Sequence, residues 1–269
     1  MKIVVCAKQV PDTTEVRLDP VTNTLIRDGV PSIINPDDKA GIEAALQLKE
    51  KCPGSTVTVV SMGPAQADVA LREALAMGCD EAILVSDRAF GGADTWATSS
   101  TIAAALKKIG DYDVIITGRQ AIDGDTAQVG PQIAEHLGIP QVSYAEKLEV
   151  EDEHTLVVQR QFEDRYHIIE IKTPCLITAL AELAEPRYMY VGGVFDAYRE
   201  KEVKVWGLAD LEGYVDTANI GLKGSPTRVA KSFTKQAKGA GEVLKDLSAD
   251  EAVEAIVAKL RKIYYLICD

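Results

Sequence analysis

The stretch DYDVIITGRQAIDGDTAQVGPQIAEHLG, residues 111–138, carries the pattern that decides the fold. It begins with a short run of apolar, β-branched residues and continues through a loop that contains glycines. It ends in a segment whose apolar residues recur at helical spacing, at Val129, Ile133 and Leu137. A strand that leads through a glycine loop into a helix is half of a βαβ unit, and it predicts a parallel sheet covered by helices.

The same alternation runs through the first 140 residues. Nearly continuous apolar runs are typical of parallel strands buried on both faces, and they occur at KIVVCAK (2–8), STVTVVSM (55–62), EAILVS (81–86) and DYDVIITG (111–118). Segments with helical periodicity lie between them, near 37–51, 65–77 and 95–109. We therefore expect an α/β fold built on an open, doubly wound and mostly parallel sheet.

Further elements are expected around this sheet. The segment VRLDPVTNTLIRDGVPSIINP, 16–36, has two short strand-like pieces around a Pro/Asn turn, which predicts a hairpin insertion. Beyond residue 140 the pattern changes to successive strands that extend or cover the sheet, with antiparallel additions among them: QVSYAEKLEVE (141–151), HTLVVQRQF (154–162), RYHIIEIKT (165–173) and CLITAL (175–180). From about 184 the chain is less regular, with a helical patch around 188–200.

The C-terminal stretch SADEAVEAIVAKLRKI, 248–263, predicts a helix. Ser248 and Glu251 form a capping box at its start. An apolar stripe then follows, made of Val253, Ile256, Val257 and Leu260. A helix with such a stripe packs either on its own domain or on a partner subunit, and the sequence leaves both possibilities open.

Composition excludes several classes of function. The net charge of −12 argues against binding to nucleic acid or to an anionic membrane, because clustered lysines and arginines grip phosphate groups. The apolar run in the N-terminal MKIVVCAKQV is too short for a signal peptide or a membrane span, so a cytoplasmic protein is expected. The five cysteines form no CxxC pair and the three histidines have no ligand spacing, so neither a disulfide framework nor a metal site is expected.

In an open α/β sheet, ligands bind beyond the carboxyl ends of the strands, so the loops there are considered together. The loop from Gly118 to Thr126 lets backbone approach a ligand, and Asp125 or Thr126 is expected to cap the next helix and leave other amides free for an anion. An ordinary capped turn is the alternative interpretation. Because neither a GxGxxG fingerprint nor a Walker lysine is present, a standard NAD site or P-loop is disfavoured.

Four other segments open onto the same crevice. Cys6 to Lys8 follow the first strand, where the alternative is a strand end with a solvated lysine. Asn35 to Asp38 suit either helix capping or contact with a purine edge or ribose. Met62, in the SMGPA turn, suits either a wall for a flat ring or a core position. FGGADTWATSS, 90–100, has two glycines that make room beside the crevice.

Taken together, these residues resemble the beta subunit of electron transfer flavoproteins, over essentially the whole chain. The most specific segment is GRQAIDGDTAQVG, 118–130, which is similar to the family's signature around a Gly-[Lys/Arg]-Gln-[Ala/Ser]-Ile-Asp core. Four other segments match in order: VCAKQVPDT (5–13), DGVPSIINPDDKAGIEAAL (28–46), SMGPAQADVALREALAMGCDEAILVSD (61–87) and EPRYM (185–189).

The resemblance implies a sheet of the adenine-nucleotide-binding type and a set of positions that hold the adenosine phosphate part of a nucleotide. Those positions are Cys6, Ala7, Lys8, Asn35, Pro36, Asp37, Asp38, Met62, Gly118, Arg119, Gln120, Ala121, Ile122, Asp123, Gly124, Asp125, Thr126, Ala127, Gln128 and Val129. Asp94 and Thr95 are further candidates for contact with a flavin ring or a nicotinamide.

Two branches of the family compete for the identity of that nucleotide. In the ordinary branch the beta subunit holds a structural AMP, the only FAD lies between it and the alpha subunit, and electrons pass to or from acyl-CoA-type dehydrogenases. In the electron-bifurcating branch the same pocket holds a second FAD that takes hydride from NADH. Its electrons then divide between ferredoxin or flavodoxin and, through the alpha-subunit FAD, a flavin-dependent dehydrogenase.

The sequence resembles the bifurcating branch in two segments. FGGADTWATSS gives an isoalloxazine ring space, and PRYMYVGGVFDAY, 186–198, stands where ordinary members tend to have a Leu-Pro-Asn loop. FAD is therefore expected in this subunit, with NAD(H) as substrate and AMP as the alternative. A non-redox adenine-nucleotide-binding protein is the alternative from another class. Because the flavin carries out the redox chemistry, no catalytic acid or base is expected.

Segment 187–201 resembles the family's docking loop for the dehydrogenase, with Val191 at the position of the anchoring apolar residue. The candidate docking residues are Tyr190, Val191, Val194 and Phe195. An amphipathic helix that packs on its own core is the alternative. The expected organisation is a nucleotide-binding α/β domain over 1–184, a docking loop and extended arm over 185–240, and a C-terminal helix over 241–269.

Overall fold

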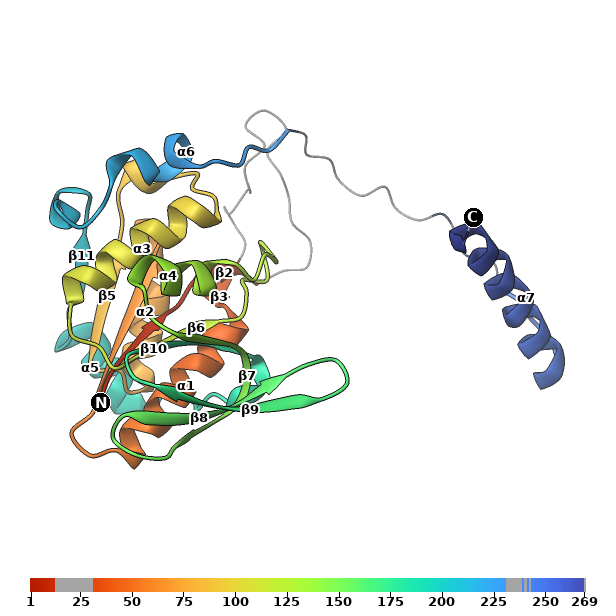
Figure 1. The fold of residues 1–269 in the computed structure, drawn as a ribbon, viewed down its shortest axis with the longest axis horizontal. Helices are drawn as coiled ribbons and strands as arrows, with labels where there is room; N and C mark the ends of the chain where they lie inside the picture. Colours follow the sequence, from red (N-terminus) through yellow and green to blue (C-terminus); the bar gives the residue numbers. More distant parts are fainter. Residues whose placement is uncertain (13–30, 231–238, 240, 242, 269) are drawn as a thin grey trace. The chain divides into compact units, whose positions relative to one another are not determined.

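The computed structural model describes residues 1–12, 31–230, 239, 241 and 243–268, with side chains up to residue 261. The chain divides into two compact units, Met1–Val229 and Ala230–Asp269. The first unit contains the whole of the large sheet shown in Figure 1.

A nine-stranded sheet forms the centre of the first unit and confirms the predicted α/β class. From one edge to the other its strands are β11 (Val203–Trp206), β5 (Glu81–Val85), β4 (Thr56–Met62), β1 (Lys2–Cys6), β6 (Val114–Gly118), β10 (Cys175–Ala179), β7 (Gln141–Val150), β8 (Thr155–Gln161) and β9 (Tyr166–Lys172). The strands from β11 to β7 are parallel. The chain leaves β1 toward β4 and β5 and then returns to the other side of β1 as β6. A topological switch point therefore lies between β1 and β6, and such points are where open sheets bind ligands.

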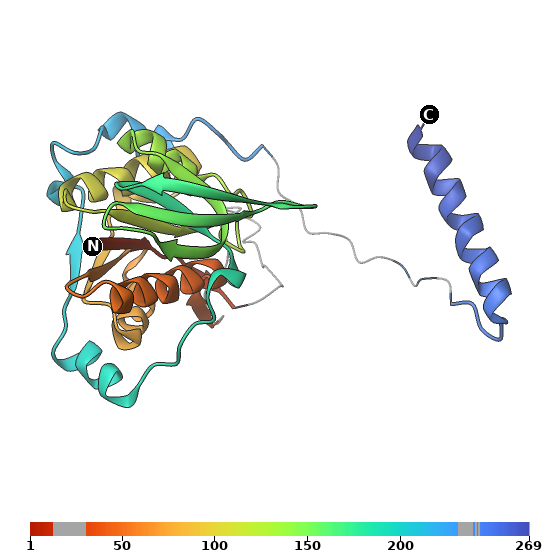
Figure 2. The same cartoon turned by 60° about the horizontal axis from the view of Figure 1, so that its bottom comes forward.

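Helices cover both faces of the parallel part (Figure 2). On one face lie α1 (Pro36–Lys51) and α2 (Asp68–Met77), and on the other lie α3 (Thr95–Ile109) and α4 (Val129–Leu137). Neighbouring residues of β1 show the division, because Val5 packs in the cluster of α1 and α2 whereas Val4 packs in that of α3 and α4. Two buried faces explain why these strands are continuously apolar.

The predicted strands after residue 140 all form, but they play different parts. β7, β8 and β9 make the antiparallel addition. By contrast, β10 lies between β6 and β7 and is parallel to both, so it belongs to the parallel core. Most of the predicted hairpin insertion, 16–36, lies outside the described residues. Its last strand-like piece, β3 (Ser32–Ile34), pairs antiparallel with β2 (Gln9–Pro11).

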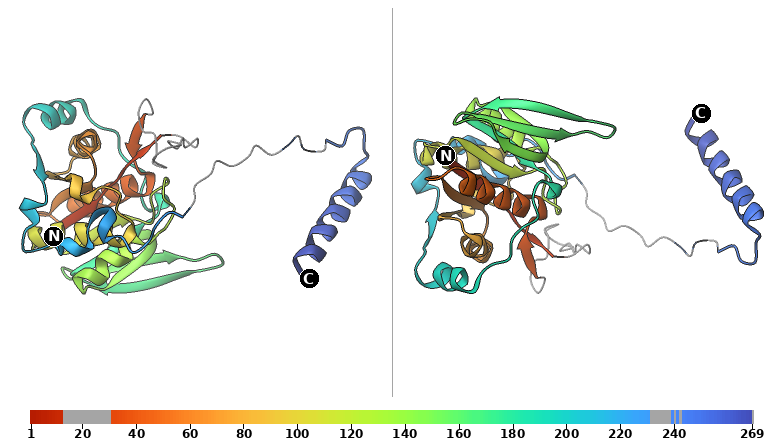
Figure 3. Two further views of the ribbon diagram at one scale, coloured as in Figure 1. Left: turned by 90° about the horizontal axis from the view of Figure 1, so that it is seen from above. Right: turned by 90° about the horizontal axis from the view of Figure 1, so that it is seen from below.

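The less regular region after 184 contains two elements of interest. The helical patch predicted around 188–200 is α5 (Val191–Arg199), which packs against α2, and both views in Figure 3 show the two side by side. The edge strand β11 follows and pairs with β5, and the sequence interpretation missed it. The chain then passes through short helical turns, including α6 (Gly221–Gly224), to Val229.

The second unit is described through its helix, α7 (Ala249–Cys268), which is longer than the predicted 248–263. The predicted capping box is confirmed: the Ser248 amide donates to Glu251 Oε2 at 2.8 Å, and the Glu251 amide donates to Ser248 Oγ at 3.4 Å. Among the described residues, no helix is both long enough and apolar enough to cross a membrane.

Candidate functional site

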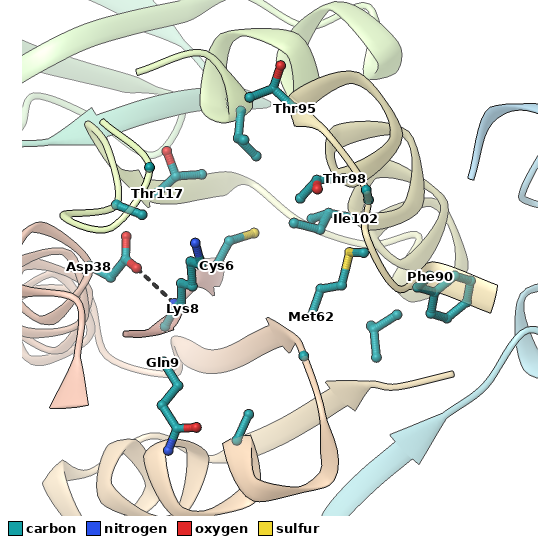
Figure 4. A pocket seen from close by; sticks show the side chains of 18 of the residues that line it. Cys6, Lys8, Gln9, Asp38, Met62, Phe90, Thr95, Thr98, Ile102 and Thr117 are labelled. Atoms are coloured by element: carbon teal, nitrogen blue, oxygen red, sulfur yellow. Dashed lines mark hydrogen bonds between the residues drawn. The ribbon is translucent and has the colours of Figure 1, made fainter. Parts of the chain in front are cut away.

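A cavity of about 1190 Å³ lies beyond the carboxyl ends of β1, β4, β5 and β6, at the switch point (Figure 4). Most of the candidate positions line it: Cys6, Ala7, Lys8, Asp38, Met62, Asp94, Thr95, Gly118, Arg119, Gln120, Ala121, Gly124, Asp125, Thr126, Ala127, Gln128 and Val129. The other candidates, Asn35, Pro36, Asp37, Ile122 and Asp123, are not part of its wall. The sheet topology thus brings together loops that are far apart in the sequence.

The loop after β6 leaves backbone amides free at the cavity. The expected capping by Asp125 or Thr126 is wrong: α4 begins at Val129 with Gln128 as N-cap, and the Gln128 side chain makes no capping bond. Asp125 and Ala127 are instead left-handed, with φ of 57° and 53°, and the Asp125 carboxylate accepts from the Gln120 side chain. Among the described residues, no hydrogen bond engages the amides of 126–128. Free amides at an uncapped helix start make an anion site.

Asn35 supports this loop from behind. Its side chain is fully buried, its Nδ2 donates to the Gln120 carbonyl at 2.8 Å, and its Oδ1 accepts from the Ile122 amide at 3.0 Å. It is the N-cap of α1, but its side chain makes no capping bond there. Because both of its polar atoms are engaged, Asn35 fixes the shape of the loop.

Asp38 joins the ends of the two strands that flank the switch point. Its Oδ2 accepts from the Lys8 amide at 2.8 Å and its Oδ1 accepts from the Gly118 amide at 2.7 Å. Burial raises the pKa of its carboxyl to about 7, although these two hydrogen bonds act in the opposite direction. A Cβ at residue 118 would lie 2.2 Å from Asp38 Oδ1, so only glycine fits there.

Two cations at the loop are each paired with an acid, one from the loop and one from α1. Lys8 Nζ lies 2.7 Å from Asp123 Oδ1, and Arg119 Nε lies 3.4 Å from Asp37 Oδ2. Burial raises the pKa of Asp37, and Arg119 counteracts that effect. At this part of the cavity the backbone amides are available to an anion, whereas Lys8 and Arg119 are each paired with a carboxylate.

Beyond the loop after β6 the cavity wall carries apolar side chains, although Ser86, Asp87 and Arg88 line it as well. The apolar side chains are those of Met62, Phe90 and Ile102, with Cys6 on the floor (Figure 4). Burial, together with nearby Asp38, raises the pKa of the Cys6 thiol to about 12, so this sulfur stays protonated and serves as a wall. A cavity with an anion-binding loop and apolar side chains in its wall suits a nucleotide that carries a flat ring.

Asp94 and Thr95 hold neighbouring elements at the rim. One oxygen of Asp94 caps α3 by accepting from the Ala97 amide at 3.0 Å, and the other accepts from the Thr227 amide at 2.9 Å. Although desolvation acts against it, these bonds hold the pKa of Asp94 below its usual value. Thr95 Oγ1 donates to Gln128 Oε1 at 2.9 Å and so connects the starts of α3 and α4.

Sequence reasoning missed several cavity residues: Phe90, Thr98, Ile102, Thr117, Gly130 and Thr227. Thr98 lies about one turn beyond Asp94 and Thr95 on α3, and helical spacing could have identified it. Thr227 comes from a distant segment, and no local pattern marks it. Among the described residues, no group of His, Cys, Asp or Glu side chains is arranged to hold a metal ion.

The four candidate docking residues lie on α5 and immediately before it. Tyr190, Val191, Val194 and Phe195 have exposed fractions from 37% to 76%. The opposite side of the helix is buried against α2. The helix thus packs on its own domain, as the alternative interpretation has it, and it also presents apolar side chains outward.

Comparison with known proteins adds to this geometry. The family described as "Electron transfer flavoprotein domain" matches residues 22–211. The electron transfer flavoprotein subunit beta of Clostridium acetobutylicum is 62% identical over 266 residues, covering 99% of this chain and 100% of that protein. The chain belongs to the electron transfer flavoprotein family. It is similar to the beta subunits of that family and is an electron-transfer protein.

Two other relatives of this electron transfer flavoprotein subunit are named for larger complexes. The caffeyl-CoA reductase-Etf complex subunit CarD of Acetobacterium woodii is 53% identical over 97% of this chain and 98% of that protein. The acryloyl-CoA reductase electron transfer subunit gamma of Anaerotignum propionicum is 49% identical, with the same coverage. Electron transfer flavoproteins pair a beta with an alpha subunit, hold flavin or AMP, and work with dehydrogenases.

Proposed function

We propose that this beta subunit binds FAD in the cavity at the switch point and takes part in NADH-dependent electron bifurcation. One observation carries the proposal: a single cavity runs from the free amides after β6 to the apolar wall at Met62, Phe90 and Ile102. Its volume of about 1190 Å³ exceeds that of typical ligand pockets, which measure roughly 300–1,000 Å³. A mononucleotide such as AMP leaves the apolar wall unused.

The residues of the cavity fit a dinucleotide with a flat ring. The amides of 126–128 and the start of α4 would hold its phosphates. Met62, Phe90 and Ile102 would exclude water around the ring, and the protonated Cys6 adds an uncharged floor. The bound flavin supplies hydride acceptance and one-electron transfer. The protein's part is to bind, orient and shield it.

The partners follow from the family and from the names of the relatives. We place an alpha subunit with the other FAD beside this chain, in a cytoplasmic heterodimer. Two relatives are named as parts of CoA-ester reductase systems. We therefore propose that the partner is a flavin-dependent dehydrogenase that acts on CoA esters. It would dock on Tyr190, Val191, Val194 and Phe195, and ferredoxin or flavodoxin would receive the other electron.

The test is a nucleotide count on the heterodimer. The alpha and beta chains are purified together, flavin is quantified per heterodimer, and released nucleotides are identified by mass. Two FAD and no AMP, together with reduction of the bound flavin by NADH, support the proposal. One FAD with one AMP contradicts it in favour of the ordinary branch, and absence of flavin contradicts both.

A pair of variants on α3 sharpens this test. Thr98 lines the cavity whereas Ser100, on the same helix, does not. Thr98→Phe fills the space beside the apolar wall, so FAD retention by this subunit should fall while AMP binding is retained. Ser100→Phe controls for a bulky aromatic on the helix. Equal FAD content in the two variants would argue against a ring at this wall.

A further inference from the structure

The residues that present the docking surface are held by buried contacts on two helices. We call residues 187–199 the α5 segment. Its apolar side chains at the surface are Tyr188, Met189, Tyr190, Val191, Val194, Phe195 and Tyr198. Side chains so exposed do not position themselves, so their arrangement depends on how the backbone beneath is anchored.

At the start of the α5 segment, Arg187 binds Glu43 of α1 through three hydrogen bonds. Arg187 Nε lies 2.7 Å from Oε2 of Glu43, Nη2 lies 2.9 Å from Oε1, and the Arg187 backbone amide donates to Oε2 at 3.1 Å. The two parallel side-chain bonds form a planar fork that only arginine makes with a carboxylate. The backbone bond fixes the main chain itself, one residue before the exposed tyrosines.

Glu43 is unusual because it is a buried acid in the middle of a helix. Burial raises the pKa of its carboxyl, but the hydrogen bonds from Arg187 outweigh this and hold the pKa below its usual value. Arg187 Nη1 also donates to Oε1 of Glu50, which lies further along α1, at 2.7 Å. Glu50 is exposed, so water competes for that contact.

Along α5 itself the contact is with α2. A Cβ at Gly193 would lie 2.5 Å from the Ala76 carbonyl oxygen, so the helices meet backbone to backbone there. The Arg72 guanidinium donates to the Ala197 carbonyl and lies 5.0 Å from the ring centroid of Tyr198. The helix is therefore supported by α2, whereas the irregular segment that leads into it is held by the Arg187–Glu43 pair.

We propose that Arg187 and Glu43 are a positioning pair that sets the orientation of the α5 segment and, through it, the affinity for the dehydrogenase. The second part rests on the proposed docking function. The pair touches neither the cavity nor the reacting groups, so it acts only through the surface that it holds. Preorganisation of a docking surface raises affinity because the ordering cost is met before the partner arrives.

The test uses the complete heterodimer and four variants of the pair and its surroundings. Arg187→Gln and Glu43→Gln break the fork, and Arg187→Lys keeps the charge but loses the planar geometry. Glu50→Gln removes only the exposed contact. Lys49→Gln is the matched control, because it breaks an ion pair between α1 and Asp80 that does not involve the α5 segment.

Two quantities are measured on each variant. Hydrogen–deuterium exchange of the amides of 188–199 in the heterodimer, without the dehydrogenase, reports how firmly the α5 segment is anchored. The KM for the heterodimer, with a purified short-chain acyl-CoA dehydrogenase that the wild type reduces, reports docking. We expect Arg187→Gln and Glu43→Gln to raise the exchange rate of these amides and the KM by roughly tenfold each. The kcat and the nucleotide content should be unchanged. Arg187→Lys should lie between, and Glu50→Gln and Lys49→Gln should resemble the wild type.

The outcomes separate this inference from the docking function. Unchanged exchange in both Arg187→Gln and Glu43→Gln would overturn the positioning pair. Val191→Asp tests the docking surface alone, because this side chain is 76% exposed and takes no part in the hydrogen bonds of the pair. If Val191→Asp raises KM but the fork variants do not, the pair has no role in docking and the inference fails. If Val191→Asp has no effect, the docking function fails, whatever the exchange result.

Discussion

Lys8 Nζ lies 2.7 Å from Oδ1 and 2.9 Å from Oδ2 of Asp123, which ties the end of β1 to the loop after β6 across the switch point. This contact explains why a loop suited to anions carries acids. Asp123 is not part of the cavity wall and its carboxylate binds Lys8, whereas the residues that follow it in the loop line the cavity. The charge of Asp123 is thus neutralised by Lys8.

Replacing Lys8 and replacing Asp123 should lower the free energy of unfolding by different amounts. Asp123 has a side-chain exposed fraction of 6% and Lys8 one of 42%, so Lys8→Met leaves an almost buried carboxylate without its cation. Because water screens the exposed lysine, we expect a loss of about 1–2 kcal/mol in the free energy of unfolding, less than for a fully buried pair. Asp123→Asn should cost less. Urea denaturation measures both, and the double variant should recover part of the loss.

Nucleotide retention gives a second measurement for the same loop. Asp123→Ala frees the loop from Lys8, so occupancy of the beta-subunit nucleotide should fall while the alpha-subunit flavin stays bound. Quantifying both nucleotides after gel filtration checks this. If Asp123→Ala retains both nucleotides, the assignment of this loop to the binding site is wrong.

The glycines in and beside the loop should divide into two kinds. At Gly118 and Gly130 an added Cβ would lie 2.2 Å from Asp38 Oδ1 and 2.6 Å from Thr117 Oγ1, so alanine at either position overpacks the core by about 1–3 kcal/mol. At Gly124 nothing lies within 4 Å of the added atom. Gly124→Ala should therefore melt like the wild type, and Gly124→Val should lower only nucleotide binding. A melting temperature lowered equally in all three alanine variants would contradict this division.

The parallel core could be predicted because its strands are buried on both faces. Val4 and Val5 point to opposite sides of the sheet and are both apolar, which is a strong local signal. β11 was missed for the opposite reason: it is a short edge strand in which Lys204 and Val205 are exposed. The place of β10 between β6 and β7 depends on long-range pairing, which runs of apolar residues do not encode.

The cavity was predictable from topology, but the division of labour within it was not. Asn35 is a reasonable capping residue, yet its partners are backbone atoms of Gln120 and Ile122, more than 80 residues away in the chain. Likewise, Asp125 is a good N-cap by type, but its left-handed backbone and its bond with Gln120 move the helix start to Val129. Residue type alone does not choose between local and distant partners.

The C-terminal helix provides a prediction about assembly. The apolar stripe of α7, Val253, Ile256, Val257 and Leu260, needs a surface to cover it. Because unit Met1–Val229 contains the whole large sheet, deleting 243–269 should leave its thermal melting unchanged. Affinity for the alpha subunit should fall, as measured by titration of the separated chains. If deletion instead lowers the melting temperature and spares association, the stripe packs on its own subunit.

Asp38 predicts a specific pH dependence of stability. Its pKa is about 7 in the folded protein, against 3.8 in the unfolded chain, because burial disfavours the carboxylate. Between these values the folded state binds a proton that the unfolded state does not, so this group's stabilising contribution is full below about pH 4 and is lost as pH rises through about 7. At about 1.4 kcal/mol per pKa unit, the loss reaches roughly 4 kcal/mol.

Asp38→Asn isolates this contribution, because other titrating groups cancel in the comparison. The amide cannot accept from both Lys8 and Gly118, so Asp38→Asn is less stable than the wild type at low pH. As pH rises from about 5 to about 8, the wild type should lose stability relative to the variant, and the difference between their free energies of unfolding should shrink. Urea denaturation across this range measures that difference. A difference that stays constant would show that Asp38 is ionised throughout, so that its two amide bonds outweigh its burial.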